Sequence, residues 1–258
     1  MELSPENLIL NLNTCFVGRH IIHYPSLPST MEVARGAGWQ GAVEGTVVIV
    51  EEQTAGRGRL QRSWISPRGG IALSIILRPS VQHLPQMIML ASLAVTNAIE
   101  SVTGLQIGIK WPNDVLIGGK KVCGILIENQ MCGSNLEFTV VGIGINVNID
   151  LSVYPEIADI ATSLSAELGQ PVSRNKLVRK LMVEVEQLYL DIKSGQSLHQ
   201  RWRERLVILG RGVQIIEEGK VEQGVAEDVD VDGSLLLRHS DGSLTRIVAG
   251  DVTLRPLL

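Results

Sequence analysis

Residues 53–64 combine glycine and arginine in a way that suits the binding of an anion. Within nine residues they contain Gly56, Arg57, Gly58, Arg59, Arg62 and Trp64. Glycine allows the backbone to approach a ligand closely, and arginine supplies a rigid fork of donors for carboxylate or phosphate. The apolar run at 46–50 comes just before and predicts a buried strand. We therefore expect an anion-binding loop at a strand end; a solvent-exposed turn is the alternative that this segment alone leaves open.

Two common phosphate-binding motifs are excluded for this loop. A Walker loop needs Gly-Lys followed by Ser or Thr, and the sequence has no such triplet. A dinucleotide fingerprint needs a third glycine three residues after Gly58, and Gln61 occupies that position.

Three further segments carry groups that could bind or react. Residues 110–114, Lys-Trp-Pro-Asn-Asp, follow an apolar run at 105–109 and would present an amine, an amide and a carboxylate on one turn. In residues 118–128, two lysines, Lys120 and Lys121, come just before a predicted buried strand. Residues 142–148 have glycine at alternate strand positions. Such glycines usually mark a ligand or a backbone against that face of the sheet. A capped turn with a packed indole is the alternative for 110–114.

Composition limits the class of protein. With 45% hydrophobic and 19% charged residues, the 258-residue chain can bury a core, and disorder is not expected. A net charge of −4 argues against a general nucleic-acid or anionic-membrane binder, and the apolar stretch at 87–99 is too short to span a membrane. The cysteines at 15, 123 and 132 form no CxxC pair, which favours free thiols in the cytoplasm.

Local patterns predict a mixture of helices and strands. Helices are expected from Ser4-Pro5-Glu6, from a capping box at Ser29–Glu32 toward Gly36, over 84–102 with Gly104 as its end, over 177–192, and over 198–209. Strands are expected at 46–50, 71–77, 105–109, 124–128 and 136–147.

The pattern of apolar and turn-forming residues changes near residue 208. Short apolar runs are separated by Glu218-Gly219, Asp232-Gly233 and Asp241-Gly242, which are typical of hairpin turns. We predict two domains, 1–207 and 208–258, the second a small β-barrel; an extra hairpin on the main sheet is the alternative.

The four segments that carry these groups are 53–64, 110–114, 118–128 and 142–148, and we call them the chemical segments. In this order they resemble the biotin protein ligase family. Its Gln-x-x-Gly-Arg-Gly-Arg loop corresponds to 53–59, its Trp-Pro-Asn-Asp turn to 111–114, its Lys-x-x-Gly-Ile-Leu-x-Glu strand to 121–128 and its Gly-x-Gly-x-Asn strand to 142–146. Met31 departs from the asparagine that many members have after Ser-Thr. The resemblance implies an α+β fold, with a mixed β-sheet catalytic domain packed with helices, of the class II aminoacyl-tRNA synthetase type, and an SH3-like C-terminal β-barrel.

The resemblance also implies a two-step reaction. The carboxylate of biotin attacks the α-phosphate of Mg-ATP to give biotinyl-5'-AMP and pyrophosphate, and a lysine of a biotin carboxyl carrier domain then displaces AMP. Two close anions repel by about 4 kcal/mol at moderate dielectric, so cations must bring them together. The sequence shows no convincing nucleophile–base pair, and its five histidines have no metal-ligand spacing.

Residue roles follow from the resemblance. The catalytic residues are expected to be Arg57, Lys110, Asp114 and Lys121, with Asp114 orienting or deprotonating the incoming amine. Biotin is expected to contact Ser29, Thr30, Met31, Gln53, Gly56, Arg57, Gly58, Arg59, Lys121, Gly124, Gly142 and Gly144. ATP or the adenylate is expected to contact Arg57, Arg59, Trp64, Asn113, Lys121 and Asn146, with Asn146 also a ligand for Mg²⁺. Residues 54–64 are expected to be mobile without ligand and to close over the intermediate.

Two rival functions are kept. A lipoate or octanoate ligase or transferase would share the fold, but its usual Arg-Arg-x-Ser-Gly-Gly-Gly loop is absent. A non-catalytic biotin sensor could dispense with Lys121 and Asp114, and both are present. Only 28 residues precede Ser29, whereas the winged helix-turn-helix of some members needs about 60. We therefore expect a monofunctional ligase that binds no nucleic acid and no membrane; an edge strand of its sheet would allow a homodimer.

Overall fold

A mixed β-sheet forms the centre of the larger part of the molecule. The computed structural model describes residues 2–217 and 220–254. Within these ranges seven strands pair in the order β1-β2-β3-β7-β6-β5-β4; β1 and β2 are parallel and the other neighbours antiparallel. The strands are β1 Ile21–Tyr24, β2 Val47–Val50, β3 Ile71–Leu77, β4 Gly108–Lys110, β5 Asp114–Ile117, β6 Lys120–Cys132 and β7 Asn135–Ile145. An α+β fold with a mixed sheet is thus confirmed.

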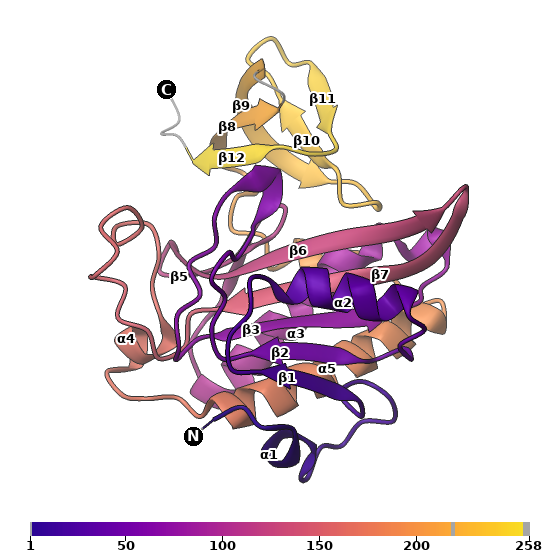
Figure 1. Cartoon of the computed structure of the whole chain (residues 1–258). Coiled ribbons are helices and arrows are strands. Elements are labelled where there is room, and N and C mark those ends of the chain that lie inside the picture. Colours follow the sequence, from indigo (N-terminus) through magenta and orange to yellow (C-terminus); the bar gives the residue numbers. More distant parts are fainter. Residues whose placement is uncertain (1, 218–219, 255–258) are drawn as a thin grey trace.

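Helices cover the two faces of this sheet unequally. Figure 1 shows α2 in front of the sheet and the long helices α3 and α5 behind it. The main core lies between the sheet and these two long helices. The helices are α1 Pro5–Ile9, α2 Thr30–Trp39, α3 Gln86–Thr103, α4 Leu164–Leu168, α5 Arg174–Lys193 and α6 His199–Arg203, with short 3-10 turns at Arg59–Gln61 and Val81–His83.

The burial of β3 explains why its residues are almost all apolar. All seven residues of Ile71–Leu77 are buried, because β3 pairs with β2 and β7 and has helices on both faces. Such a strand contains mostly apolar residues on both faces and does not alternate. Helix α3 ends as predicted at Gly104, which adopts the left-handed conformation with φ of 75°.

A second sheet follows α6. Within the described residues its five strands are antiparallel neighbours in the order β11-β10-β9-β8-β12, with bounds β8 Gly212–Glu217, β9 Lys220–Val229, β10 Leu235–Arg238, β11 Leu244–Ile247 and β12 Asp251–Leu254. The predicted turns at Asp232-Gly233 and Asp241-Gly242 join β9 to β10 and β10 to β11, and both glycines have positive φ. The turn predicted at Glu218-Gly219 lies outside the described residues. This separate sheet fits the expected SH3-like fold.

The sheets meet near the turn at 110–114. The indole Nε1 of Trp111 donates to the carbonyl of Gly233 at 2.8 Å, and Arg59 Nη1 lies 3.5 Å from the carbonyl of Gly250. In Figure 1 the loop between β2 and β3 extends from the main sheet toward the second one. The second sheet therefore lies next to residues that the sequence predicts to be functional.

Several local predictions were wrong in extent. The helix expected over 198–209 covers only α6, and the strand expected at 105–109 is only β4. Strands β1 and β5 and helix α4 were not predicted, and Asp114 begins β5 instead of ending a turn. These elements are four or five residues long, too short for a periodic pattern. No described helix has the length and apolarity needed to cross a bilayer.

Candidate active site

One cavity of about 830 Å³ gathers the predicted residues. It lies where the first turn of α2, the loop after β2, the turn between β4 and β5, and strands β6 and β7 meet. The predicted residues along it are Ser29, Thr30, Met31, Gln53, Arg57, Gly58, Arg59, Trp64, Lys110, Asn113, Asp114, Lys121, Gly124, Gly142, Gly144 and Asn146. The predicted residue outside it is Gly56, where a Cβ would lie 2.4 Å from the carbonyl oxygen of Trp64. Gly56 is needed for the close packing of the loop on itself.

The start of α2 is capped by a distant side chain. Ser29 occupies the N-cap position but makes no side-chain cap bond, so the predicted capping box is wrong. Instead Gln53 Oε1 accepts hydrogen bonds from the Thr30 amide at 2.9 Å and the Thr30 hydroxyl at 3.2 Å, and Ser74 donates to that hydroxyl at 2.8 Å. Ser29, Thr30 and Gln53, the three polar residues predicted to bind biotin, are therefore adjacent to one another at one end of the cavity.

Glu32, the other half of the expected capping box, pairs with the glycine loop. Its carboxylate lies 2.9 Å from Arg57 Nη2. Arg59 Nη1 donates to Asn113 Oδ1 at 3.0 Å, and Asn113 in turn donates to the carbonyl of Ile125 at 3.0 Å. The two arginines thus connect the loop to α2 and to the 110–114 turn. Asn113 orients Arg59 and holds the turn against β6.

Asp114 and Lys121 form an ion pair at 2.6 Å inside the cavity. The register between β5 and β6 shifts here: Val115 pairs with Cys123, but Leu116 pairs with Lys121, so Val122 has no partner opposite it. Strand alternation alone would place Lys121 on the face of Cys123, which is in the core. The bulge turns Lys121 toward the cavity, beside Asp114.

The alternate glycines of β7 make room for side chains. A Cβ on Gly144 would lie 2.4 Å from Trp64 Nε1, and one on Gly142 would lie 2.4 Å from the Met31 sulfur. Lys121 Nζ lies 5.4 Å from the centre of the Trp64 ring, within the range of a cation–π contact. The neighbours of these glycines are therefore cavity-lining side chains, where the sequence predicted a ligand or another backbone.

Some cavity residues were not predicted from sequence. Residues 156–161 contribute Glu156, Ile157, Asp159, Ile160 and Ala161, and the second sheet contributes Thr253. The loop is tied to the β6 bulge, because the Lys121 amide donates to the carbonyl of Ile160 and the Thr162 amide donates to the carbonyl of Lys121, both at 2.9 Å. Nothing in the composition of 156–161 indicates this; the segment pairs with Lys121 beyond the point where the β6–β7 ladder ends, at Cys123 and Ile145.

The chemistry available is charge stabilisation and proton transfer. Arginine and lysine side chains surround the cavity together with the Asp114 carboxylate. Burial raises the pKa of the Cys123 thiol, which keeps it protonated in the core and unsuited to nucleophilic attack. The described residues contain no group of three or more His, Cys, Asp or Glu that could hold a metal ion.

Comparison with known proteins gives consistent similarities. Residues 24–146 match the biotin/lipoate A/B protein ligase family, and residues 208–255 match the biotin protein ligase C terminal domain. The chain is 36% identical to the bifunctional ligase/repressor BirA of Bacillus subtilis, over 98% of this chain and 79% of that protein. It is 34% identical to the biotin--[acetyl-CoA-carboxylase] ligase of Paracoccus denitrificans, over 76% of this chain and 85% of that one.

A solved structure agrees with these sequence similarities. The biotin protein ligase from Aquifex aeolicus in complex with biotin and ATP superimposes with a TM-score of 0.79 at 28% identity, covering 93% of this chain and all of that one.

Proposed function

The chain belongs to the biotin protein ligase family, and we propose that it activates biotin with ATP as biotinyl-5'-AMP and transfers the biotinyl group to a lysine of a carrier protein. The observation that carries this proposal is that residues of all four chemical segments line the same cavity. The Aquifex aeolicus neighbour, named as a complex with biotin and ATP, supports the same two substrates.

In the first step a biotin carboxylate oxygen bonds to the α-phosphorus of ATP as the bond to pyrophosphate breaks. Both reactants are anions, and their approach is favourable only beside cations. Arg57 and Arg59 on the glycine loop and Lys110 and Lys121 on the adjoining strands supply positive charge from two sides of the cavity. The enzyme thus contributes position and charge, with no covalent enzyme intermediate.

The uncharged end of biotin is assigned to Ser29, Thr30 and Gln53. These side chains meet at the buried start of α2, where a ureido group would find donors and acceptors together. A polar ligand group buried without partners loses about 1–3 kcal/mol of binding. Met31 and Trp64, packed on the sheet glycines, supply apolar walls for the rest of the molecule.

In the second step the carrier lysine nitrogen attacks the acyl carbon, the bond to AMP breaks, and the amine loses a proton. Asp114 is assigned to accept that proton, and Lys121 to neutralise the phosphate of the leaving AMP. Their ion pair supports a joint role, because it keeps the Asp114 carboxylate next to the Lys121 cation. Asn146, whose amide donates to the carbonyl of Thr162 at 3.1 Å, is assigned to the phosphate end.

Magnesium is expected to enter with ATP. Mg²⁺ prefers oxygen ligands and commonly binds through one or two protein groups together with substrate phosphates. The donor set of this cavity fits that mode, because it offers the Asn146 amide oxygen and no cluster of acids among the described residues. Bound there, the ion would neutralise phosphate charge.

The carrier is proposed to be the biotin carboxyl carrier domain of a carboxylase such as acetyl-CoA carboxylase, in line with the name of the Paracoccus denitrificans relative. The three free cysteines, Cys15, Cys123 and Cys132, agree with the proposed cytoplasmic location.

The test is ATP–pyrophosphate exchange measured with biotin, with lipoate and with neither, followed by labelling of a purified carrier domain. Exchange with biotin and labelling of the carrier support the proposal. Exchange with lipoate alone would reassign the substrate, and no exchange with either acid would indicate a protein that does not catalyse adenylation.

A further inference from the structure

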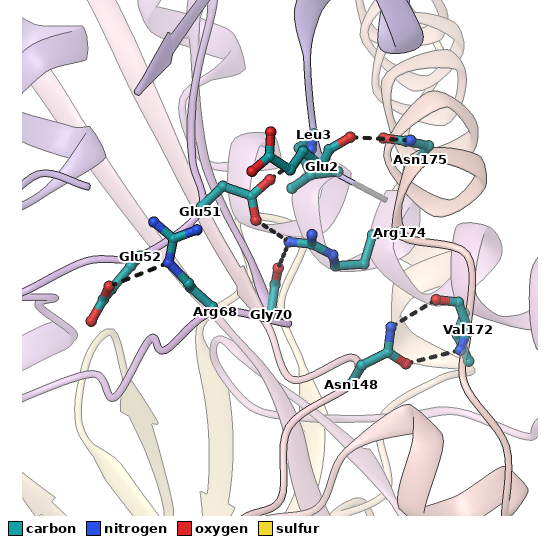
Figure 2. Close-up of polar contacts among 10 residues, drawn as sticks. All are labelled: Glu2, Leu3, Glu51, Glu52, Arg68, Gly70, Asn148, Val172, Arg174 and Asn175. Carbon is teal, nitrogen blue, oxygen red and sulfur yellow. Dashed lines mark hydrogen bonds and ion pairs between the residues drawn. The ribbon is translucent and has the colours of Figure 1, made fainter. Parts of the chain in front are cut away.

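A buried carboxylate directly follows strand β2. Glu51 is 4% exposed, and its two oxygens have different partners: the Leu3 amide donates to Oε1 at 2.6 Å, and Arg174 Nη1 donates to Oε2 at 2.7 Å. Figure 2 shows these contacts between the N-terminal segment, the end of β2 and the start of α5. The Arg174 side chain is itself only 11% exposed. A buried pair of this kind is held in one geometry.

The start of α5 is joined to two more strand ends. Arg174 Nη1 also donates to the carbonyl of Gly70, the residue before β3, at 3.1 Å. Asn148, which follows β7, makes a double hydrogen bond with the backbone of Val172: its amide donates to the carbonyl and its oxygen accepts from the N–H, both at 2.9 Å. The ends of β2, β3 and β7 are therefore held by one cluster at the start of α5.

These strand ends lead directly into the cavity. Glu51 lies two residues before Gln53, which caps α2 and lines the cavity, and Asn148 lies two residues after Asn146, which also lines it. Glu51, Arg174 and Asn148 do not themselves line the cavity. The cluster supports the site from outside and touches no substrate.

We propose that Glu51 and Arg174 are positioning residues of the ligase: their buried pair fixes the end of β2, so that Gln53 is held where it can cap α2 and bind the ligand at once. This inference rests on the proposed function, because Gln53 is assigned there to biotin. A small displacement of a binding group is enough to weaken binding strongly. If the end of β2 were flexible, the Gln53 side chain could hydrogen-bond either Thr30 or the ligand, but not both at once.

The decisive variants are Arg174→Lys, which keeps the charge but not the guanidinium fork, and Glu51→Gln, which keeps the shape. We expect each to raise KM for biotin about tenfold, the effect of one lost ligand hydrogen bond, with kcat and KM for ATP within about twofold. A merely structural role predicts the reverse: fewer active molecules, hence lower kcat, with KM for biotin unchanged.

The neighbouring pair Glu52–Arg68 provides a matched control. Glu52 directly follows Glu51 in the chain, and its pair with Arg68 is also drawn in Figure 2. Glu52 Oε2 and Arg68 Nε are 3.8 Å apart, and the two side chains are 42% and 58% exposed, respectively. Glu52→Gln and Arg68→Met are therefore expected to leave KM for biotin within about twofold of the wild type.

A double-variant cycle tests whether the effect passes through Gln53. In a Gln53→Ala background, Arg174→Lys is expected to raise KM for biotin by less than about twofold. An unchanged KM in the folded single variants, or a full tenfold rise added to Gln53→Ala, would overturn the inference.

Folding is checked by circular dichroism and thermal unfolding, and kinetics are measured where every variant is folded. If wild type shows no exchange, the proposed function fails, and the biotin dissociation constant measured by calorimetry applies the same positioning test.

Discussion

The Asp114 carboxylate and the Lys121 ammonium lie 2.6 Å apart across a β-bulge between β5 and β6. The pair is only partly exposed and lies beside the Trp64 ring. Each side chain therefore depends on the other for its position, and a change in one alters the electrostatics of both.

We expect Asp114→Asn to separate the two chemical steps. Transfer to the carrier should fall about 100-fold or more, as for loss of a general base, whereas biotin-dependent pyrophosphate exchange should fall less than tenfold. Lys121→Met should reduce both steps. Single-turnover measurement of adenylate formation and of carrier labelling distinguishes the steps. Equal losses in both steps for Asp114→Asn would contradict its assignment as the proton acceptor.

Gly144→Ala should displace Trp64 from the sheet. The new Cβ would lie 2.4 Å from the indole nitrogen, closer than packed atoms allow. We expect KM for ATP or biotin to rise about tenfold or more, as for a misplaced binding group. Gly36→Ala is the control, because no atom outside its own helix lies within 4 Å of the new methyl; it should leave the kinetics unchanged and stabilise the fold by about 0.5–1 kcal/mol. A Gly144→Ala enzyme with wild-type constants would refute the packing argument.

Ligands should protect the glycine loop from trypsin. The loop contains Arg57, Arg59 and Arg62, and its tip places Leu60 in an exposed left-handed conformation with φ of 52°. A loop that closes over a water-sensitive adenylate should be cut slowly when biotin and ATP are both present. Cleavage is followed by mass spectrometry. Equal cleavage rates with and without the two substrates would contradict closure.

Trp111→Phe should weaken the docking of the second sheet. The variant keeps most of the buried ring but removes the donor to the carbonyl of Gly233. We expect a loss of about 1–2 kcal/mol in the free energy of unfolding, measured with urea. Trp39→Phe is the matched control, because Trp39 is half exposed on α2 and its indole makes no hydrogen bond with the described residues. The prediction fails if both variants are equally stable.

Acid should destabilise the wild type more than Glu51→Gln. Burial raises the pKa of Glu51, but the hydrogen bonds from Arg174 and the Leu3 amide outweigh it and hold that pKa below 4.5; nearby His23 acts in the same direction. A lowered folded-state pKa gives stability that is complete above about 4.5 and is lost as the pH falls below it. Urea unfolding from pH 6 to pH 3 should show a steeper loss for the wild type than for the variant. Parallel curves would contradict this.

Sequence patterns predicted the elements whose signals are local. Strand β3 is a continuous apolar run, and α3 combines helical spacing with a terminal glycine, so both could be assigned closely. The four chemical segments identified the family because each carries its own residues within a few positions. Their meeting in one cavity needed the fold, since they lie in the loop after β2, in the turn between β4 and β5, and on β6 and β7.

Contacts between distant residues were beyond the local pattern. Ser29 and Glu32 have the spacing of a capping box, but Gln53 from the loop after β2 caps the helix and Glu32 binds Arg57 instead. Such a competition is decided by which partner the fold brings near. The spacing of two residues in the sequence reveals the nearby partner but not the competing partner that the fold brings in from elsewhere in the chain.

By itself the sequence determined which residues are present for the chemistry, the family, and the long periodic elements, because these depend on neighbours along the chain. The tertiary structure alone decided that Lys121 faces Asp114, through a one-residue bulge that reverses strand alternation. It also decided that Thr253 and the 156–161 loop join the cavity and that Glu51 and Arg174 support it. The physical reason is that register, bulges and buried pairs depend on partners far away along the chain, 123 residues in the case of Glu51 and Arg174.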